Sequence, residues 1–426
     1  MKTYIEKLPP DVRALIETAR VVAQERGCTA YLVGGFVRDL ILGVKNFDLD
    51  IVVEGDGIAF ASDYARRLQG KLVTHHRFGT ATVSLGHHVK VDIASARKEV
   101  YPQPGHLPVV EAGTLRDDLY RRDFTINAMA LQITGSGYGR VIDLFGGRKD
   151  LAAKKLRILH PVSFIDDPTR ILRGIRFEQR FDFSFERNTL RLLKAAVAES
   201  MLERVEPQRL RDELILLLKE QRPAKIIRRI SAVAGFSFIN PKLRSSPRMI
   251  RTLAAIERRV AWFKQHIKNP RQLETWLIFF MGLVGYLPLS EVHAICRRFV
   301  FRKGEEKRIV SCVESCSRAV AVLKKRSLRP SEAFRVLEPL SYEVIIIMLA
   351  LTGSSLVAMR IKEFLNVSIG TKLYVSGHDL SACGLKPGPH YQRILRAVLN
   401  AKLDGKVKDI SEELRLARTI AARSLR

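Results

Sequence analysis

Strand-like and helix-like segments mix only in the first third of this chain, and nearly every later segment has its apolar residues at helical spacing. The expected strands are Tyr31–Val33, Phe47–Val53, Ala81–Leu85, Val89–Ala94 and Val141–Phe145. From about Arg148 onward, apolar residues recur at spacings of three and four, which predicts amphipathic helices that pack on one another. The sequence therefore predicts an α+β fold, in which a small head with a mixed β-sheet and helices is followed by an extended all-α neck, body and tail.

A chain of 426 residues is longer than one hydrophobic core usually serves, so several structural units are expected. Glycine and proline mark breaks between helical segments near residues 235–247, 327–330 and 384–389. The expected units are a head over residues 1–147, a neck over 148–222, a body over 223–327 and a tail over 328–426.

The charge of the chain is strongly positive, because 72 Lys and Arg residues outnumber 44 Asp and Glu residues and give a formal net charge of +28. A well-solvated surface could carry such an excess, but an imbalance of this size is more typical of a protein that binds a polyanion. Residues 275–289 and 344–351 are the most apolar segments, and both are shorter than the roughly 20 residues of a membrane span. We therefore expect two buried helices there, and nucleic acid instead of a membrane as the partner.

Two aspartates, Asp48 and Asp50, lie two residues apart in the best strand pattern of the protein. Their side chains should leave the same face of the strand, while Leu49 and Ile51 point into the core. Carboxylate pairs of this kind suit Mg²⁺, which also takes water and substrate phosphates as ligands. The pair could also be an ordinary wet face of an edge strand. Asp92 is either a third carboxylate near the metal site or a solvated residue.

A glycine pair, Gly34-Gly35, opens a helix directly before this strand, with Arg38 and Asp39 in the first turn. Glycines let backbone N–H groups approach a phosphate, and a helix N-terminus favours its negative charge. A tight strand-to-helix turn is the simpler alternative. The G-x-x-x-x-G-K-[ST] loop is absent from the sequence, which argues against an ordinary kinase or ATPase.

Several motifs in a fixed order resemble the bacterial-type (class II) tRNA nucleotidyltransferases, the CCA-adding family, which shares its head with bacterial poly(A) polymerases. These motifs are Gly34-Gly-Phe-Val-Arg-Asp39, Asp48-Leu-Asp50, Arg121-Arg-Asp-Phe-Thr-Ile-Asn127, Asp166-Asp-Pro-Thr-Arg170 and Arg209-Leu-Arg-Asp-Glu213. The resemblance covers roughly the first 220 residues and is looser in the tail.

The resemblance implies a role for each motif. Asp48 and Asp50 would hold the catalytic Mg²⁺ ions, and Gly34, Gly35 and Arg38 would lie near the triphosphate. Arg122, Asp123 and Asn127 would contact the incoming nucleotide. Without the resemblance, the Arg121–Asn127 segment reads as an ordinary helix start with Asp123 as its cap.

In this family protein side chains select the base, and the matching residues here are Asp166, Asp167 and Arg170. A carboxylate can accept from an exocyclic amino group, and a guanidinium can donate to ring nitrogens or carbonyls. The family usually has Glu where this chain has Asp166. Asp167 could also cap a helix whose first residue is Pro168. Arg173, with Arg176 and Arg180, forms a basic stripe that faces either nucleotide phosphates or solvent.

The resemblance is greatest for enzymes that add the terminal A, which predicts a tRNA 3′ end and ATP, with CTP as a further candidate, as substrates. Full CCA addition, CC addition, poly(A) synthesis and non-catalytic RNA binding remain as alternatives. Five cysteines, an odd number and few for this length, suit reduced thiols in a cytoplasmic protein.

Overall fold

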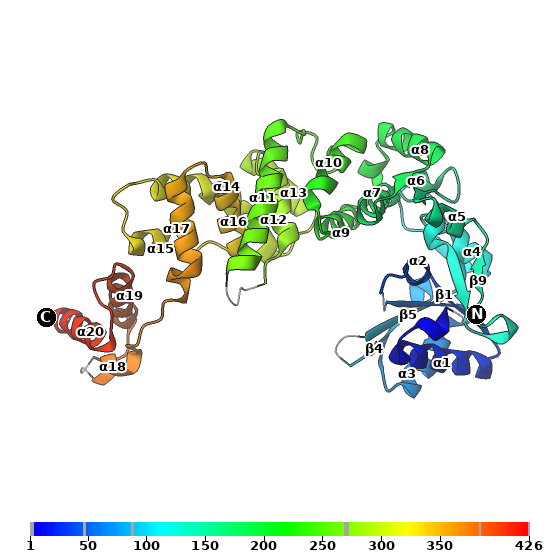
Figure 1. Cartoon of the computed structure of the whole chain (residues 1–426), viewed down its shortest axis with the longest axis horizontal. Coiled ribbons are helices and arrows are strands. Elements are labelled where there is room, and N and C mark those ends of the chain that lie inside the picture. Colours follow the sequence, from blue (N-terminus) through cyan, green and yellow to red (C-terminus); the bar gives the residue numbers. More distant parts are fainter. Residues whose placement is uncertain (1–3, 46–47, 87–88, 268–271, 383–384, 425–426) are drawn as a thin grey trace. The chain divides into compact units, whose positions relative to one another are not determined.

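A computed structural model describes residues 4–45, 48–86, 89–267, 272–382 and 385–424 (Figure 1). Packing divides the chain into two compact units, one formed by Met1–Leu217 with Arg229–Phe238 and the other by Leu218–Arg228 with Ile239–Arg426. The finer division into head, neck, body and tail stays a prediction.

A seven-stranded mixed sheet forms the centre of the first unit, with the strand order β3-β4-β5-β2-β1-β8-β9. The strands β2 and β5 are parallel, and the other neighbours are antiparallel. The strands are β1 (Thr29–Val33), β2 (Leu49–Glu54), β3 (Lys71–His75), β4 (Thr80–Leu85), β5 (Val89–Ser95), β8 (Met129–Gln132) and β9 (Val141–Asp143). The predicted mixed sheet is confirmed, although Phe47, the expected start of β2, lies outside the described residues.

Both faces of this sheet are covered. Helices α1 (Pro10–Glu25) and α3 (Gly57–Arg67) pack on each other and against the sheet, and α2 (Gly35–Leu42) packs on β1 and β8. Val33 and Val52 belong to a buried cluster with residues of α4 (Leu115–Tyr120). Because side chains alternate along a strand, Asp50 leaves β2 on the same face as Val52.

The Arg121–Asn127 segment does not begin an α-helix, so the alternative of an ordinary helix start is wrong. Helix α4 ends at Tyr120, Phe124 is extended with φ −137° and ψ 151°, and Thr125–Asn127 form a single 3₁₀ turn before β8. The Phe124 ring is fully buried and meets Phe177 edge to face. Burial of this ring, a tertiary effect, overrides the local helical preference.

The rest of the first unit is mostly helical. Two short pairings interrupt it, since β6 (Arg97–Val100) pairs with β7 (Val109–Ala112), and β10 (Lys155–Leu156) pairs with β11 (Ser184–Phe185). The second pairing lies after Arg148, where almost only helices were expected, and its strands are two residues long. The helices are α5 (Gly147–Ala152), α6 (Ser163–Asp166), α7 (Thr169–Phe181), α8 (Arg187–Ala198), α9 (Pro207–Leu218), which reaches the division, and α10 (Pro223–Val233), which crosses it.

Helices make up the regular structure of the second unit. Its two most apolar helices, α12 (Thr275–Val284) and α16 (Tyr342–Leu351), are almost completely buried, as predicted. No helix among the described residues is long and apolar enough to cross a bilayer. The others are α11 (Pro247–His266), α13 (Leu289–Arg298), α14 (Lys303–Leu323), α15 (Pro330–Leu337), α17 (Ser355–Asn366), α18 (Gly377–Ala382), α19 (Pro389–Leu403) and α20 (Ile410–Ser424).

Candidate functional site

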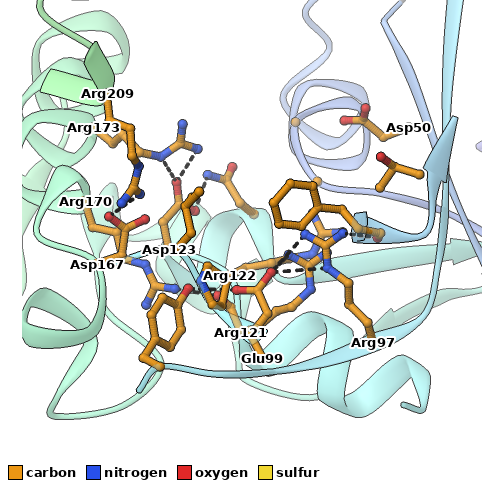
Figure 2. A pocket seen from close by; sticks show the side chains of 18 of the residues that line it. Asp50, Arg97, Glu99, Arg121, Arg122, Asp123, Asp167, Arg170, Arg173 and Arg209 are labelled. Carbon is orange, nitrogen blue, oxygen red and sulfur yellow. Dashed lines mark hydrogen bonds and ion pairs between the residues drawn. The ribbon is translucent and has the colours of Figure 1, made fainter. Parts of the chain in front are cut away.

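A cavity of about 580 Å³ lies in the first unit and collects most of the residues expected at the site. Its lining includes Gly34, Gly35, Arg38, Asp50, Arg122, Asp123, Asn127, Asp167, Arg170 and Arg173. Asp48, Asp92 and Asp166 are not among the lining residues. Figure 2 shows Asp50 toward one end of the cavity and Asp167 and Arg170 toward the other.

Carboxylates gather at the first end, on neighbouring parallel strands. Asp50 of β2 stands in register with Asp92 of β5, and Asp48 is exposed just before β2 begins. Burial, together with the negative charges of Asp92 and Asp48, raises the pKa of Asp50 to about 6 against the opposing effect of Arg122. A bound cation would relieve this cost, so the residues fit a hard metal ion.

Few protein side chains are available as ligands for a metal ion at this end of the cavity. Thr82 donates a hydrogen bond of 2.5 Å to Asp92, which is exposed. Among the described residues, no group of three or more His, Cys, Asp or Glu side chains is arranged to hold one ion. An ion held by Asp48 and Asp50 would therefore take water or phosphate oxygens as its further ligands.

The glycine turn brings Arg122 close to this carboxylate end. Gly34 has φ 71° and ψ −136°, and a Cβ added there would lie 2.9 Å from Nη1 of Arg122 and 3.5 Å from Oδ2 of Asp50. Arg122 is held by Asp118 through a hydrogen bond of 2.8 Å, while its Nε is buried without a partner among the described residues. An unsatisfied buried donor beside a glycine turn suits an anionic ligand.

Substituting Gly34 by alanine should lower kcat/KM for the nucleotide by roughly tenfold to a hundredfold, because the new Cβ displaces Arg122 and strains the backbone. Gly43→Ala is the matched control, since Gly43 also has φ 71° but no described atom lies within 4 Å of its added Cβ. Steady-state kinetics and thermal melts of both variants make the comparison. Equal activity losses in the two variants would contradict this assignment.

Arg38, which was expected near the triphosphate, lines the cavity and is 5% exposed. Its side chain donates to Asp39 at 2.8 Å and to the Asn127 side-chain oxygen at 2.7 Å. Its guanidinium carbon lies 4.5 Å from the centroid of the Phe181 ring. The structure therefore gives Arg38 one evident role, which is to hold Asn127, and its contact with a triphosphate stays a prediction.

Asp123 is buried and fully engaged by protein donors. One carboxylate oxygen accepts from the Phe124 backbone N–H and the Asn127 amide, and the other accepts two N–H groups of Arg173 at 2.9 and 2.7 Å. Arg173 also donates to Glu213 at 3.2 Å. Burial alone would raise the pKa of Asp123, but Arg173 and Asn127 bring it down to about 2.

The expected base-selecting residues lie at the junction of α6 and α7. Asp167 Oδ1 accepts from the backbone and hydroxyl of Thr169 and from Nη2 of Arg209. No donor reaches Asp167 Oδ2 among the described residues. Asp167 thus accepts from the first backbone N–H of α7, but the helix begins at Thr169 with Pro168 at its N-cap position, so the predicted cap of a helix starting at Pro168 is wrong.

Arg170 is also anchored at its far end. Its Nη1 donates to the Ser163 hydroxyl at 2.6 Å, and its Nη2 donates to the Arg121 carbonyl at 2.6 Å. Within the described part of the chain, no acceptor contacts its Nε. Asp167 and Arg170 therefore present one carboxylate oxygen and one N–H group that protein contacts do not use.

One wall of the cavity was not predicted as part of the site. Glu99 accepts hydrogen bonds from Arg97 and Arg121 (Figure 2) and from Tyr101. Arg121 also binds the buried Asp118. The alternation of Arg97, Glu99 and Tyr101 was a usable signal, because side chains two apart in a strand share a face. Arg209 was visible only as part of a motif.

The cavity is strongly basic as a result. Its arginines outnumber its carboxylates, which are Asp50, Glu99, Asp123 and Asp167. Such a lining favours a ligand with several negative charges, as a triphosphate has. The arginines are Arg38, Arg97, Arg121, Arg122, Arg170, Arg173 and Arg209.

Known proteins resemble the chain over this site and beyond it. A family model described as the poly A polymerase head domain matches residues 30–157. The chain is 36% identical over 419 residues to an A-adding tRNA nucleotidyltransferase of Geobacter sulfurreducens, and the match covers 97% of this chain but 48% of that protein. The chain thus spans about half the length of this relative.

A second relative and a solved structure match this chain along nearly all or all of their length. An A-adding tRNA nucleotidyltransferase of Halalkalibacterium halodurans is 32% identical over 422 residues, which cover 96% of this chain and 93% of that protein. The structure of a Thermotoga maritima CCA-adding enzyme complexed with tRNA has a TM-score of 0.77 and 34% identity, with 100% of both chains covered. From its motifs, its fold and these relatives, the chain belongs to the class II tRNA nucleotidyltransferase family.

Proposed function

We propose that this chain adds the terminal A, from ATP, to the 3′ end of a tRNA that ends in CC. The observation that carries the proposal is the cavity itself, which has the metal-suited Asp50 at one end and the unused Asp167 oxygen and Arg170 N–H at the other. A nucleoside triphosphate needs recognition at both of these ends. The A-adding relatives favour this subtype.

Base recognition follows from the unused groups. The exocyclic amino group of adenine can donate to Asp167 Oδ2, while its neighbouring ring nitrogen can accept from Nε of Arg170. Cytosine also has an amino group beside an acceptor, so these two residues could serve ATP and CTP alike. Discrimination between them then depends on how the protein positions the pair.

Triphosphate binding falls to the basic wall and the glycine turn. Arg122, whose Nε is unsatisfied, and the Gly34-Gly35 backbone are placed to bind phosphate oxygens between Asp50 and the base-selecting residues. Asp48 and Asp50 would hold Mg²⁺, which when bound activates the attacking 3′ hydroxyl and stabilises the leaving oxygen. Asp92 remains a candidate for a third carboxylate contact.

The remainder of the chain is proposed to bind tRNA through sequence-independent phosphate contacts from its basic body and tail. The division into head, neck, body and tail is part of this proposal. All cysteines in the described residues are free, which is in keeping with a reducing cytoplasm as the place of action.

A defined-end assay tests the proposal. Transcripts of one tRNA that end before CCA, after C, or after CC are incubated with Mg²⁺ and each nucleoside triphosphate separately. We expect a single A on the CC-ending transcript and no extension of the others. Addition of C to the shorter transcripts would indicate a CC-adding or full CCA-adding enzyme, and a long A tract would indicate a poly(A) polymerase. No incorporation on any transcript would refute enzymatic function.

A further inference from the structure

His160 lies between two residues of the base-selecting segment that do not contact each other directly. Its Nε2 is 3.4 Å from Nη1 of Arg170, and its Nδ1 is 3.8 Å from Oδ2 of Asp166. Within the described residues, no hydrogen bond or ion pair joins Asp166 to Arg170. The imidazole therefore lies between a carboxylate outside the cavity lining, beyond hydrogen-bond distance, and a guanidinium inside it.

The protonation state of the ring follows from its surroundings. Burial, together with the charge of Arg170, lowers the pKa of His160 to about 4, so the ring is neutral near pH 7. A neutral imidazole has one N–H donor and one acceptor nitrogen, and an arginine can only donate. Nε2 must therefore accept from Arg170, which leaves the proton on Nδ1, facing Asp166.

The ring is held in this orientation by its neighbours. The His160 side chain is 10% exposed, and its ring centroid lies 5.2 Å from that of Tyr120. The backbone oxygen of Arg121, next to Tyr120, accepts from Nη2 of Arg170. Arg170 is thus fixed from two sides, with His160 and Ser163 at Nη1 and Arg121 at Nη2.

We propose that His160 is a positioning residue for base selection. In this Asp166–His160–Arg170 relay, the carboxylate orients and polarises the imidazole, and the imidazole directs Arg170 so that its unused Nε–H meets the ring nitrogen of the base. The inference rests on the proposed function, because it concerns the group that would read adenine. The relay also gives Asp166, which does not line the cavity, the role of orienting the His160 ring.

Three variants of the full chain test the relay on the CC-ending transcript. His160→Leu removes both polar nitrogens, His160→Gln keeps a donor and an acceptor, and His160→Leu with Asp166→Glu lengthens the carboxylate by one methylene toward Arg170. The readouts are the ratio of kcat/KM for ATP to that for CTP, and the separate kcat and KM values. His75→Leu, at an exposed imidazole on β3, is the matched control.

We expect His160→Leu to lower the ratio of kcat/KM for ATP to kcat/KM for CTP about tenfold, mainly through a higher KM for ATP. A change of this size corresponds to the loss of one hydrogen bond to a charged group. His160→Gln should keep most of the preference, and Asp166→Glu should restore much of it in the His160→Leu background. The His75 control should match the wild type.

Two results would overturn the relay. One is an unchanged preference in His160→Leu, and the other is an equal loss for every triphosphate with no restoration by Asp166→Glu, which would mean a purely structural role. Failure of the proposed function is seen separately in the wild type. If the wild type prefers CTP or makes a long A tract, the proposed function fails. The relay is still tested, because the variants should change the wild-type ratio of kcat/KM for the two triphosphates.

Discussion

Replacing Asp50 by asparagine is expected to lower kcat by about a thousandfold or more with Mg²⁺ present, since metal ions supply several kcal/mol of transition-state stabilisation in phosphoryl transfer. Asparagine keeps the size of the side chain but removes the negative charge that a cation needs. The measurement is single-nucleotide addition to the CC-ending transcript under saturating ATP.

Folding should not suffer in this variant. The ionised form of Asp50 is disfavoured by burial and by Asp92 and Asp48, so the thermal midpoint of Asp50→Asn in a chelator should equal or exceed that of the wild type. Asp63→Asn is the control, because Asp63 pairs with Arg26 and Arg66 away from the cavity. Full incorporation by Asp50→Asn would refute metal-assisted transfer at this site.

Removing the Asp123 carboxylate should have the largest effect on stability. Asp123→Ala leaves Arg173, whose side chain is 33% exposed, without its bidentate partner and frees the Asn127 amide, at a cost of about 3 kcal/mol, the low end for a broken buried pair because the guanidinium keeps contact with water. For a unit of this size, the loss corresponds to a thermal midpoint lower by about 10 °C. Thermal melts of the full chain, followed by circular dichroism, measure it.

A double-mutant cycle with Arg173→Ala separates the ion pair from other effects of the alanine. The double variant should lose less stability than the sum of the single variants, because neither member of the Asp123–Arg173 pair is left without the other. Additive losses would show that the pair contributes nothing specific.

The pH dependence of this pair has a definite sign. The pKa of Asp123 is lowered from an ordinary value of 3.8 to about 2, so its contribution to stability is complete above about pH 4. The contribution is lost as the pH falls from about 4 toward 2. The difference in thermal midpoint between the wild type and Asp123→Asn should therefore narrow below pH 4, and a constant difference would contradict the assignment.

Local patterns were enough to predict the carboxylate end of the site. The two-residue spacing of Asp48 and Asp50 and the glycine turn at Gly34 depend only on neighbouring residues, and the structure keeps Asp50 and Gly34 together at the cavity. The register of Asp92 with Asp50 was not predictable, because it depends on β5 pairing with β2 in parallel. Whether Asp92 acts as a ligand stays a prediction.

The base-selecting end shows the limit of sequence reasoning. Asp167, Arg170 and Arg173 were expected to face the nucleotide, yet Arg173 is bound to Asp123, fifty residues away, and Arg170 is anchored by the Arg121 carbonyl. Arg209 meets Asp167 across 42 residues, and it was not predicted as a site residue. Spacing along the chain carries no information on such distant partners.

By itself, the sequence determined the α+β head, the helical remainder and the positions of the metal-suited aspartates, since each follows from periodicity or composition within short segments. Only the tertiary structure decided which polar groups stay available for a ligand, because partners distant in sequence, such as Asp123 for Arg173 and the Arg121 carbonyl for Arg170, use up the other groups. A buried polar group without a partner costs free energy, so most of these groups are paired within the protein. Three polar atoms of the lining side chains have no protein partner among the described residues and define what the site can bind. They are Oδ2 of Asp167, Nε of Arg170 and Nε of Arg122.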